Sequence, residues 1–269
     1  MAEYSQRLEE LVQERTWQLK KAQAELLKSE RLAAIGELAG MVGHDLRNPL
    51  TGIKNSAYFL KKKGSAISPD QSKEMLEIIE KCVDYSNKII SDLLDYSRDI
   101  HLELKECSPR QLILESLVMV QVPENVKIVN NLLHKQTFKV DPDKIKRVFV
   151  NLIKNAEDAM PNGGKLTIDG RVNGHFELSF EDTGVGMSEE LLPKLFSPLF
   201  TTKAKGMGFG LAICKRIVEA HGGSIAVKTA KDQGTTFTLI LPIEPKTDFG
   251  GEKIWIKTSE SSLSMTTKT

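Results

Sequence analysis

The first part of the chain, from Tyr4 to Lys63, has the composition and spacing of a long helix. It is rich in Glu, Gln, Lys, Leu and Ala, and its only proline is Pro49. Arg15 interrupts an apolar seam whose members follow a period close to 3.5 residues: Leu8, Val12, Leu19, Ala22 and Leu26. A rod of roughly 60 residues would be ~90 Å long, too long to be stable alone. The pattern therefore predicts a two-stranded coiled coil over residues 1–30, and with it a dimer.

A second helix is predicted after a turn near Gly64. Ser68 has the features of an N-cap, Pro69 suits the first helical position, and Gln71 completes a capping-box pattern. The helix should run to about Ser97. Its apolar residues recur mostly at intervals of three and four: Met75, Ile78, Ile79, Cys82, Ile89, Ile90, Leu93 and Leu94. An antiparallel hairpin has too few layers for a core, so residues 31–101 are expected to pair into a four-helix bundle.

The pattern changes after Arg98. A short helix is predicted at about 109–120, and β-like runs occur at 127–129, 165–168, 176–180, 224–229 and 236–241. Helical patterns lie between these runs, and glycines concentrate here. This favours an α/β domain over residues 102–245. Residues 246–269 are polar and predict a mostly disordered tail, although residues 253–256 are able to form an edge strand.

Composition narrows the functional classes. The 269 residues carry 37 basic and 36 acidic side chains, a net charge of +1, so nucleic-acid binding is not expected. The cysteines, Cys82, Cys107 and Cys214, lack the spacing of a zinc site or a disulfide framework. No apolar run is long enough to span a membrane. We expect a cytoplasmic protein, or the cytoplasmic part of a membrane-bound sensor.

The first candidate for chemistry is the segment His44-Asp45-Leu46-Arg47-Asn48-Pro49-Leu50, inside the first bundle helix. Pro49 removes a backbone donor and leaves the carbonyl of Asp45 without its usual partner. Small residues before His44 leave room for its imidazole to be exposed. A neutral imidazole attacks phosphorus through one unprotonated nitrogen, and Asp45 is placed to accept the proton of the other. A solvated His–Asp pair on a helix surface remains the alternative.

Two polar groups in the second half are candidates for nucleotide binding. Asn151 and Asn155 lie four residues apart on one helix face, where their oxygens suit Mg²⁺. Asp182 follows a β-like run and begins Asp-x-Gly-x-Gly, with Gly184 and Gly186, so its carboxylate is placed to accept from an exocyclic amine such as that of adenine. The alternatives are a pair of surface amides and an ordinary tight turn.

A glycine-rich segment, Gly206-Met-Gly-Phe-Gly-Leu, precedes a helical pattern over 211–221 and is suited to hold phosphate oxygens. It is neither the dinucleotide-binding fingerprint nor a P-loop. Before it, aromatic residues and Lys203 form a stretch able to close as a lid, and Gly234 supplies another close-approach glycine before the last strand.

These segments resemble a known family. His44 to Leu50 resembles the H-box of sensor histidine kinases, and the later segments resemble, in order and spacing, the N, G1, F, G2 and G3 boxes of the Bergerat-type ATP-binding fold. The resemblance implies a dimeric antiparallel four-helix bundle with an N-terminal coiled coil, followed by an α/β sandwich. It also implies a protein-histidine kinase that uses ATP and Mg²⁺.

The resemblance also implies roles for single residues. His44 would accept the phosphoryl group, Asp45 would act as the general base, and Asn48 would orient water for dephosphorylation of the partner. Asn155 would be the principal Mg²⁺ ligand, assisted by Asn151, and Asp182 would bind adenine. The remaining nucleotide contacts would be Gly184, Gly186, Lys203, Gly206, Gly208, Gly210, Leu211 and Thr235. The chain departs from the common pattern at Leu199, Met207 and Asp158, and the last puts one phosphate contact in doubt.

The implied partners are a second copy of the chain, an upstream sensory domain and a response regulator whose aspartate receives the phosphoryl group. We further hypothesise that Gly36, Gly40 and Gly43 weaken the helix before His44, so that bending or rotation there sets the output. Two other functions remain open at this point. The chain could be a catalytically silent dimeric adaptor that binds ATP, or an ATPase of the gyrase or mismatch-repair kind.

Overall fold

The computed structural model describes residues 2–37, 39–132, 137–203 and 206–243. Contacts divide the chain into two compact units. The first, here called the helical unit, comprises Met1–Asp99 and Ser197–Ile213, and the second, the sheet unit, comprises Ile100–Phe196 and Cys214–Thr269. The expected functional division at residues 30, 101 and 245 remains a prediction.

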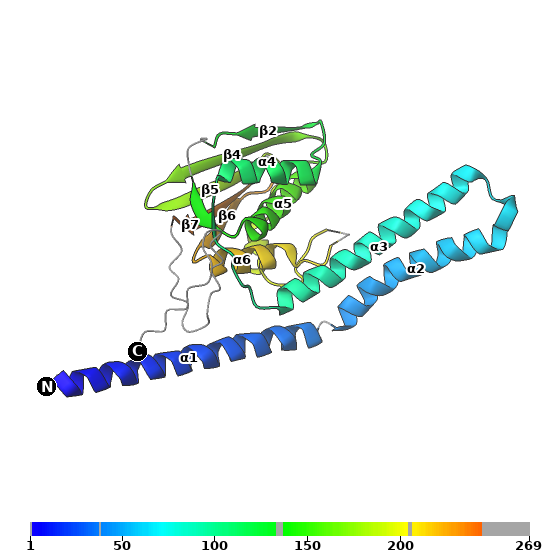
Figure 1. The fold of residues 1–269 in the computed structure, drawn as a ribbon. Coiled ribbons are helices and arrows are strands. Elements are labelled where there is room, and N and C mark those ends of the chain that lie inside the picture. Colours follow the sequence, from blue (N-terminus) through cyan, green and yellow to red (C-terminus); the bar gives the residue numbers. More distant parts are fainter. Residues whose placement is uncertain (1, 38, 133–136, 204–205, 244–269) are drawn as a thin grey trace, which may run out of the picture. The chain divides into compact units, whose positions relative to one another are not determined.

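Long helices make up most of the helical unit: α1 (Ala2–Glu37), α2 (Ala39–Lys63) and α3 (Pro69–Ser97), with the 3-10 turn η1 (Gly64–Ala66) between the last two (Figure 1). The predicted start of α3 is confirmed. The hydroxyl of Ser68 accepts a hydrogen bond from the backbone N–H of Gln71 at 3.2 Å, and Pro69 occupies the first turn. Helix α2 continues through Pro49 without interruption.

Helices α2 and α3 pack along their length as a hairpin. Ile89 on α3 is buried, and at Gly52 the two helices approach so closely that a Cβ there would lie 2.8 Å from the sulfur of Cys82. A second row of apolar side chains on α3 is left exposed at intervals of mostly seven residues: Leu76, Val83, Ile90 and Leu94. The hairpin alone therefore covers only part of its apolar surface.

The sheet unit contains a five-stranded sheet in the order β2-β4-β5-β7-β6. Its strands are β2 (Val126–Asn130), β4 (Gly164–Val172), β5 (His175–Asp182), β6 (Ser224–Thr229) and β7 (Thr235–Pro242). Strands β2 and β4 are parallel and the other pairs are antiparallel. All five correspond to β-like runs in the sequence, which confirms the α/β class.

Two short strands, β1 (Lys105–Cys107) and β3 (Phe138–Val140), pair with each other and were not expected from the sequence. The helices of this part of the chain are α4 (Pro109–Val120), α5 (Pro142–Ala159) and α6 (Gly210–Ala220), with the 3-10 turn η2 (Glu189–Lys194). Helix α4 begins and ends where the sequence predicted. The expected edge strand at 253–256 lies outside the described residues.

Helices α4 and α5 lie across one face of the sheet (Figure 1). Alternate residues of β5 and β7 are buried, as period-two patterning requires. The apolar face of α5 covers them, and Phe149 on α5 packs against Phe180 on β5 with 5.5 Å between ring centroids. This core fixes the end of α5 and the end of β5, the two places from which the candidate nucleotide residues project.

Candidate functional site

His44 lies on the exposed surface of helix α2. Its side chain is 68% exposed, as its small neighbours in the sequence suggested. The Nδ1 atom lies 3.2 Å from Oδ1 of Asp45. Since a carboxylate accepts and does not donate, in the neutral imidazole this contact places the ring proton on Nδ1 and leaves Nε2 with a lone pair. Asn48 follows one turn later and is exposed, while Pro49 is buried. The arrangement suits a nucleophilic imidazole.

The two asparagines of α5 lie side by side. The Nδ2 atom of Asn155 donates to Oδ1 of Asn151 at 3.0 Å, so the four-residue spacing does bring them to one face of the helix. Both are half-buried. Their amide side chains lie together in the C-terminal half of α5, and their role as Mg²⁺ ligands remains a prediction.

Asp182 is the last residue of β5 and is only 4% exposed. Its Oδ1 accepts from the backbone N–H of Gly184 at 2.8 Å and from that of Thr235 at 3.2 Å. Burial raises the pKa of this carboxyl, and the two hydrogen bonds lower it in part. A buried carboxylate with one oxygen in use and a raised pKa is typical of a group that awaits a polar ligand.

Glycines hold the loop after Asp182 in place. A Cβ at Gly184 would collide with the carbonyl of Ala159, at the end of α5, and one at Gly186 would collide with that of Ala230. Gly234 has φ +80°, and a Cβ there would meet the carbonyl of Asp182. The backbones of three segments therefore meet around the Asp182 carboxylate with no room for side chains. This close approach is the reason that Asp-x-Gly-x-Gly is required here.

Thr229, at the end of β6, was not identified from the sequence. Its hydroxyl accepts from the N–H of Met187 at 3.0 Å, donates to the carbonyl of Gly234 at 3.0 Å, and lies 3.0 Å from the hydroxyl of Thr235. It thus joins the loop after Asp182 to the turn before β7. A single threonine in a strand gives no sequence signal for such a role.

The other expected nucleotide contacts belong to the segment Ser197–Ile213, which groups with the helical unit. They are Lys203, Gly206, Gly208, Gly210 and Leu211. In that segment Gly208 has φ +68°, and a Cβ there would collide with the backbone of Leu199 and Phe200. Helix α6 begins at Gly210, directly after these glycines. The glycine loop therefore does precede a helix N-terminus, as the sequence predicted.

Leu76 and Val83 are two further residues that sequence reasoning missed. With Ile90 they repeat every seven residues on the exposed side of α3, while Cys82, whose sulfur lies against Gly52, faces α2. The sequence shows one wide apolar stripe, and only the structure separates the side that packs within the hairpin from the side that does not. The signal that could have separated them was the seven-residue repeat itself.

Among the described helices, none has the length and apolar character of a membrane span.

Comparison with known families assigns the two regions. Residues 34–101 match the model of the His Kinase A (phospho-acceptor) domain. Residues 140–245 match that of the histidine kinase-, DNA gyrase B- and HSP90-like ATPases, which makes this region an ATP-binding domain. The first match contains His44, and the second contains Asn151, Asn155 and Asp182.

Individual proteins agree with the family models. The chain is 37% identical over 233 residues to the signal transduction histidine-protein kinase AtoS of Escherichia coli (strain K12), covering 84% of this chain and 38% of AtoS. It is 34% identical to the sensor histidine kinase ZraS of the same organism, covering 82% of this chain and 48% of ZraS. The chain thus spans less than half the length of these relatives.

Among solved structures, the histidine kinase ThkA in complex with the response regulator protein TrrA has a TM-score of 0.69 and 29% identity, covering 86% of this chain and 68% of that one.

Proposed function

The chain belongs to the sensor histidine kinases, and from this premise we propose that it transfers the γ-phosphoryl group of ATP to His44. The observation that carries the proposal is the exposed imidazole of His44 with Asp45 at its Nδ1 atom. An exposed His–Asp pair alone would also fit a solvated surface pair, and the match to the phospho-acceptor domain over residues 34–101 favours the nucleophile. The exposed imidazole is accessible to a second domain that brings a phosphate.

In the proposed reaction Nε2 of His44 attacks the γ-phosphorus in line. A nitrogen–phosphorus bond forms, the bond from the γ-phosphorus to the bridging oxygen breaks, and ADP leaves with the electron pair. The ring gains positive charge as the bond forms. The carboxylate of Asp45, at 3.2 Å from Nδ1, stabilises that charge and is placed to accept the Nδ1 proton as the general base.

ATP is proposed to bind around Asp182 and the α5 asparagines. The free oxygen of the Asp182 carboxylate would accept from the exocyclic amine of adenine, at the floor of a site lined by Gly184 and Gly186. Thr235 would line the same site, through the turn that its N–H ties to Asp182. Lys203, Gly206, Gly208, Gly210 and Leu211 would contact the phosphates.

The α5 asparagines fit Mg²⁺. Two amide side chains on one helix face offer oxygen ligands, with Asn155 as the principal one and Asn151 assisting. Within the described ranges no group of three or more His, Cys, Asp or Glu side chains gathers to hold a metal. The ion would therefore take its remaining ligands from water and from the phosphates, whose charge it neutralises when bound.

The proposal extends to partners. The exposed row on α3 supports a homodimer, in which a second hairpin covers Leu76, Val83 and Ile90 as a four-helix bundle. His44 would then pass its phosphoryl group to an aspartate of a response regulator, and Asn48 would orient water for the reverse, phosphatase reaction. We place this work in the cytoplasm, where ATP is available, under the control of a sensory domain upstream.

Incubation of the purified chain with γ-labelled ATP and Mg²⁺ tests the proposal. The wild-type protein should acquire an acid-labile, alkali-stable label, and mapping should place it on residue 44. His44→Gln should remove the label entirely while leaving nucleotide binding unchanged. His175→Gln, which removes a histidine from β5, serves as the matched control and should label normally. Label that persists in His44→Gln, or a wild-type chain that binds ATP and is never labelled, would refute the proposal.

A further inference from the structure

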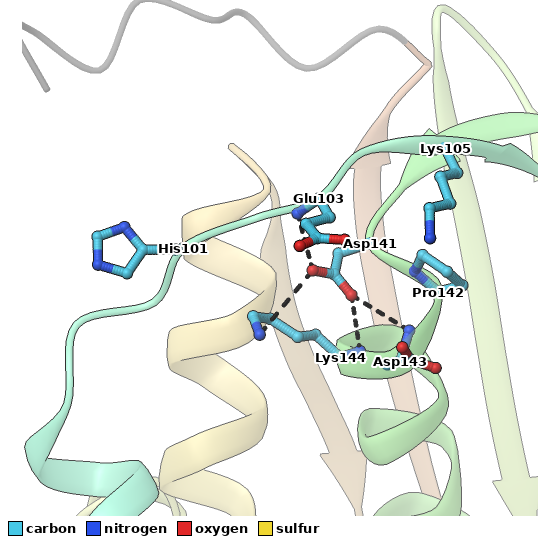
Figure 2. A pocket seen from close by; sticks show the side chains of 7 residues that line it. All are labelled: His101, Glu103, Lys105, Asp141, Pro142, Asp143 and Lys144. Atoms are coloured by element: carbon cyan, nitrogen blue, oxygen red, sulfur yellow. Dashed lines mark hydrogen bonds and ion pairs between the residues drawn. The ribbon is translucent and has the colours of Figure 1, made fainter. Parts of the chain in front are cut away.

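One carboxylate in the sheet unit bonds to segments that are distant in sequence. Asp141 follows β3 directly, caps α5, and is 4% exposed. Its Oδ1 accepts from the backbone N–H groups of Asp143 at 3.2 Å and Lys144 at 3.1 Å. Its Oδ2 accepts from the backbone N–H of Glu103 at 2.9 Å and lies 3.9 Å from the ammonium nitrogen of Lys144 (Figure 2). Capping uses one oxygen, and the second oxygen bonds to the chain that arrives from α3.

His221 holds the same residue from the other side. It is 1% exposed and follows α6. Its Nδ1 lies 2.7 Å from the carbonyl of Ile217, which can only accept, so Nδ1 carries the proton. Nε2 then has a lone pair and accepts from the backbone N–H of Asp141 at 3.0 Å. Burial lowers the pKa of His221, which favours this neutral form. Both nitrogens are in use, unlike those of His44.

The segments that meet at Asp141 are the ones on which phosphoryl transfer would depend. Glu103 lies in the chain between α3, in the helical unit, and the first strand of the sheet unit. Helix α5, which Asp141 caps, carries Asn151 and Asn155. Because Glu103 is bonded to the start of α5, the connection from the hairpin ends at a fixed point relative to the asparagines.

We propose that Asp141 and His221 are a positioning pair. Oδ2 of Asp141 anchors the connecting chain at Glu103, and His221 holds the Asp141 backbone. The rate of phosphorylation of His44 then depends on Oδ2 of Asp141, an atom that touches neither the nucleotide nor the imidazole. The inference rests on the proposed function. Without this bond, a longer stretch of the chain between α3 and β1 would be unattached. The effective concentration of ATP at His44 would then be lower, and its orientation toward His44 would be less well defined.

Asp141→Asn separates the anchor from the cap. Asparagine is also a good N-cap, but it has a single acceptor oxygen and cannot serve both α5 and Glu103. Two backbone donors favour the cap, so the amide nitrogen would face the Glu103 N–H and the anchor would be lost. Asp143→Asn is the matched control, because it removes the same charge two residues further on, from a side chain that is 84% exposed.

The full chain is used, with three measurements on each variant: nucleotide affinity by titration with ATP·Mg²⁺, the initial rate of His44 labelling at saturating ATP, and hydrogen exchange at the Glu103 amide. For Asp141→Asn we expect affinity within about 2-fold of wild type and a labelling rate lower by roughly 10-fold or more. Exchange at Glu103 should be faster. Asp143→Asn should match the wild type in all three.

Two results for Asp141→Asn would overturn the proposal. One is a normal labelling rate despite faster exchange at Glu103. The other is a rate that falls only together with nucleotide affinity, which would indicate a purely structural role. Failure of the wild-type chain itself to label would defeat the proposed function instead, and is distinguishable because affinity and Glu103 exchange are still measured.

A second pair of variants keeps the inference testable if Asp141→Asn does not fold. In His221→Gln the amide oxygen takes the place of Nε2 and still accepts from Asp141, whereas in His221→Asn the shorter side chain reaches only the position of Nδ1. The labelling rate at saturating ATP should be close to wild type for the glutamine variant and reduced for the asparagine variant. Equal rates in the two variants would contradict the role of His221.

Discussion

In the sheet unit, the apolar side chains of α5 and β5 are almost completely buried, whereas in the helical unit Leu76, Val83 and Ile90 each keep 41–51% of their surface exposed. The chemistry differs in the same way. Asp182 is buried and its burial raises its pKa, while His44 is exposed on a helix surface. Exposed apolar side chains also occur in the sheet unit, where Val118 and Met119 on α4 are 78% and 68% exposed. The row on α3 differs in its spacing, because it repeats every seven residues as the seam between paired helices does. We infer from this repeat that a second chain covers the row on α3.

The largest effect expected is on the sheet unit. Phe180→Ala removes a ring that is 2% exposed and packs on Phe149, so unfolding of this unit should become easier by about 3–5 kcal/mol. Hydrogen exchange should accelerate throughout β5 and stay unchanged in α3. Val172→Ala, at a site that is 45% exposed, is the control and should have little effect. Equal acceleration in α3 would mean that the two units are not independent.

The next effect concerns association. Ile90→Glu places a carboxylate in the exposed row, where the single hairpin tolerates it but a paired one does not. The dimer should weaken by at least about 100-fold, or ~3 kcal/mol, as measured by sedimentation. Lys88→Glu introduces the same side chain at an exposed position on the opposite side of α3 from Ile90 and should leave the dimer intact. A dimer that survives Ile90→Glu would show that this row is not the interface.

A smaller effect per residue is expected at the glycines before His44. A Cβ at Gly36, Gly40 or Gly43 would meet nothing within 4 Å, so alanine fits at each. Each substitution should stabilise the helix by up to about 1 kcal/mol. If bending there sets the output, the triple variant attached to its sensory domain should label His44 at one constant rate. A normal response to the signal would exclude this hypothesis.

The smallest effect is the pH dependence of the nucleotide-free sheet unit. Because burial raises the folded-state pKa of Asp182, folding favours its protonated form. That stability is complete below the pKa of the unfolded chain and is lost as pH rises through the folded-state value. Asp182→Asn has no carboxyl group to ionise at this position. The difference in melting temperature, variant minus wild type, should therefore increase by a few degrees as the pH rises from acidic to neutral.

Glu124→Gln, which neutralises an exposed carboxylate elsewhere in the sheet unit, controls for the change in charge. A difference between Asp182→Asn and wild type that does not vary with pH would argue against a raised pKa. ATP binding should be lost in Asp182→Asn at every pH.

Much of the fold could be predicted from the sequence, because the patterns that specify it involve residues close together in the chain. The Ser68 cap and α4 depend on neighbours within a few residues, and strands β5, β6 and β7 show period-two burial. Strands β1 and β3, three residues each, are too short to show a period. They exist because distant segments pair, and sequence pattern does not record such pairing.

The same distinction between local and distant contacts applies to the candidate site. The proximity of Asn151 and Asn155 and the place of Asp182 at a strand end were predictable from spacing, and the structure shows both. Their roles in binding remain predictions. The bond from Asp141 to Glu103 was not predictable, because an Asp before a proline signals only a helix cap. Which distant N–H the second oxygen meets is decided by the tertiary fold.

The close approach at Gly52 limits how the hairpin is able to move. Any side chain there would displace the Cys82 thiol, and separation of α2 from α3 would leave an unfilled gap. Turning or sliding of α2 keeps the two helices in contact, whereas spreading does not. His44 lies about two turns before this point on the same helix. A mechanical input from α1 would therefore reach the imidazole as a twist or an axial shift, and the far tip of the hairpin would stay closed.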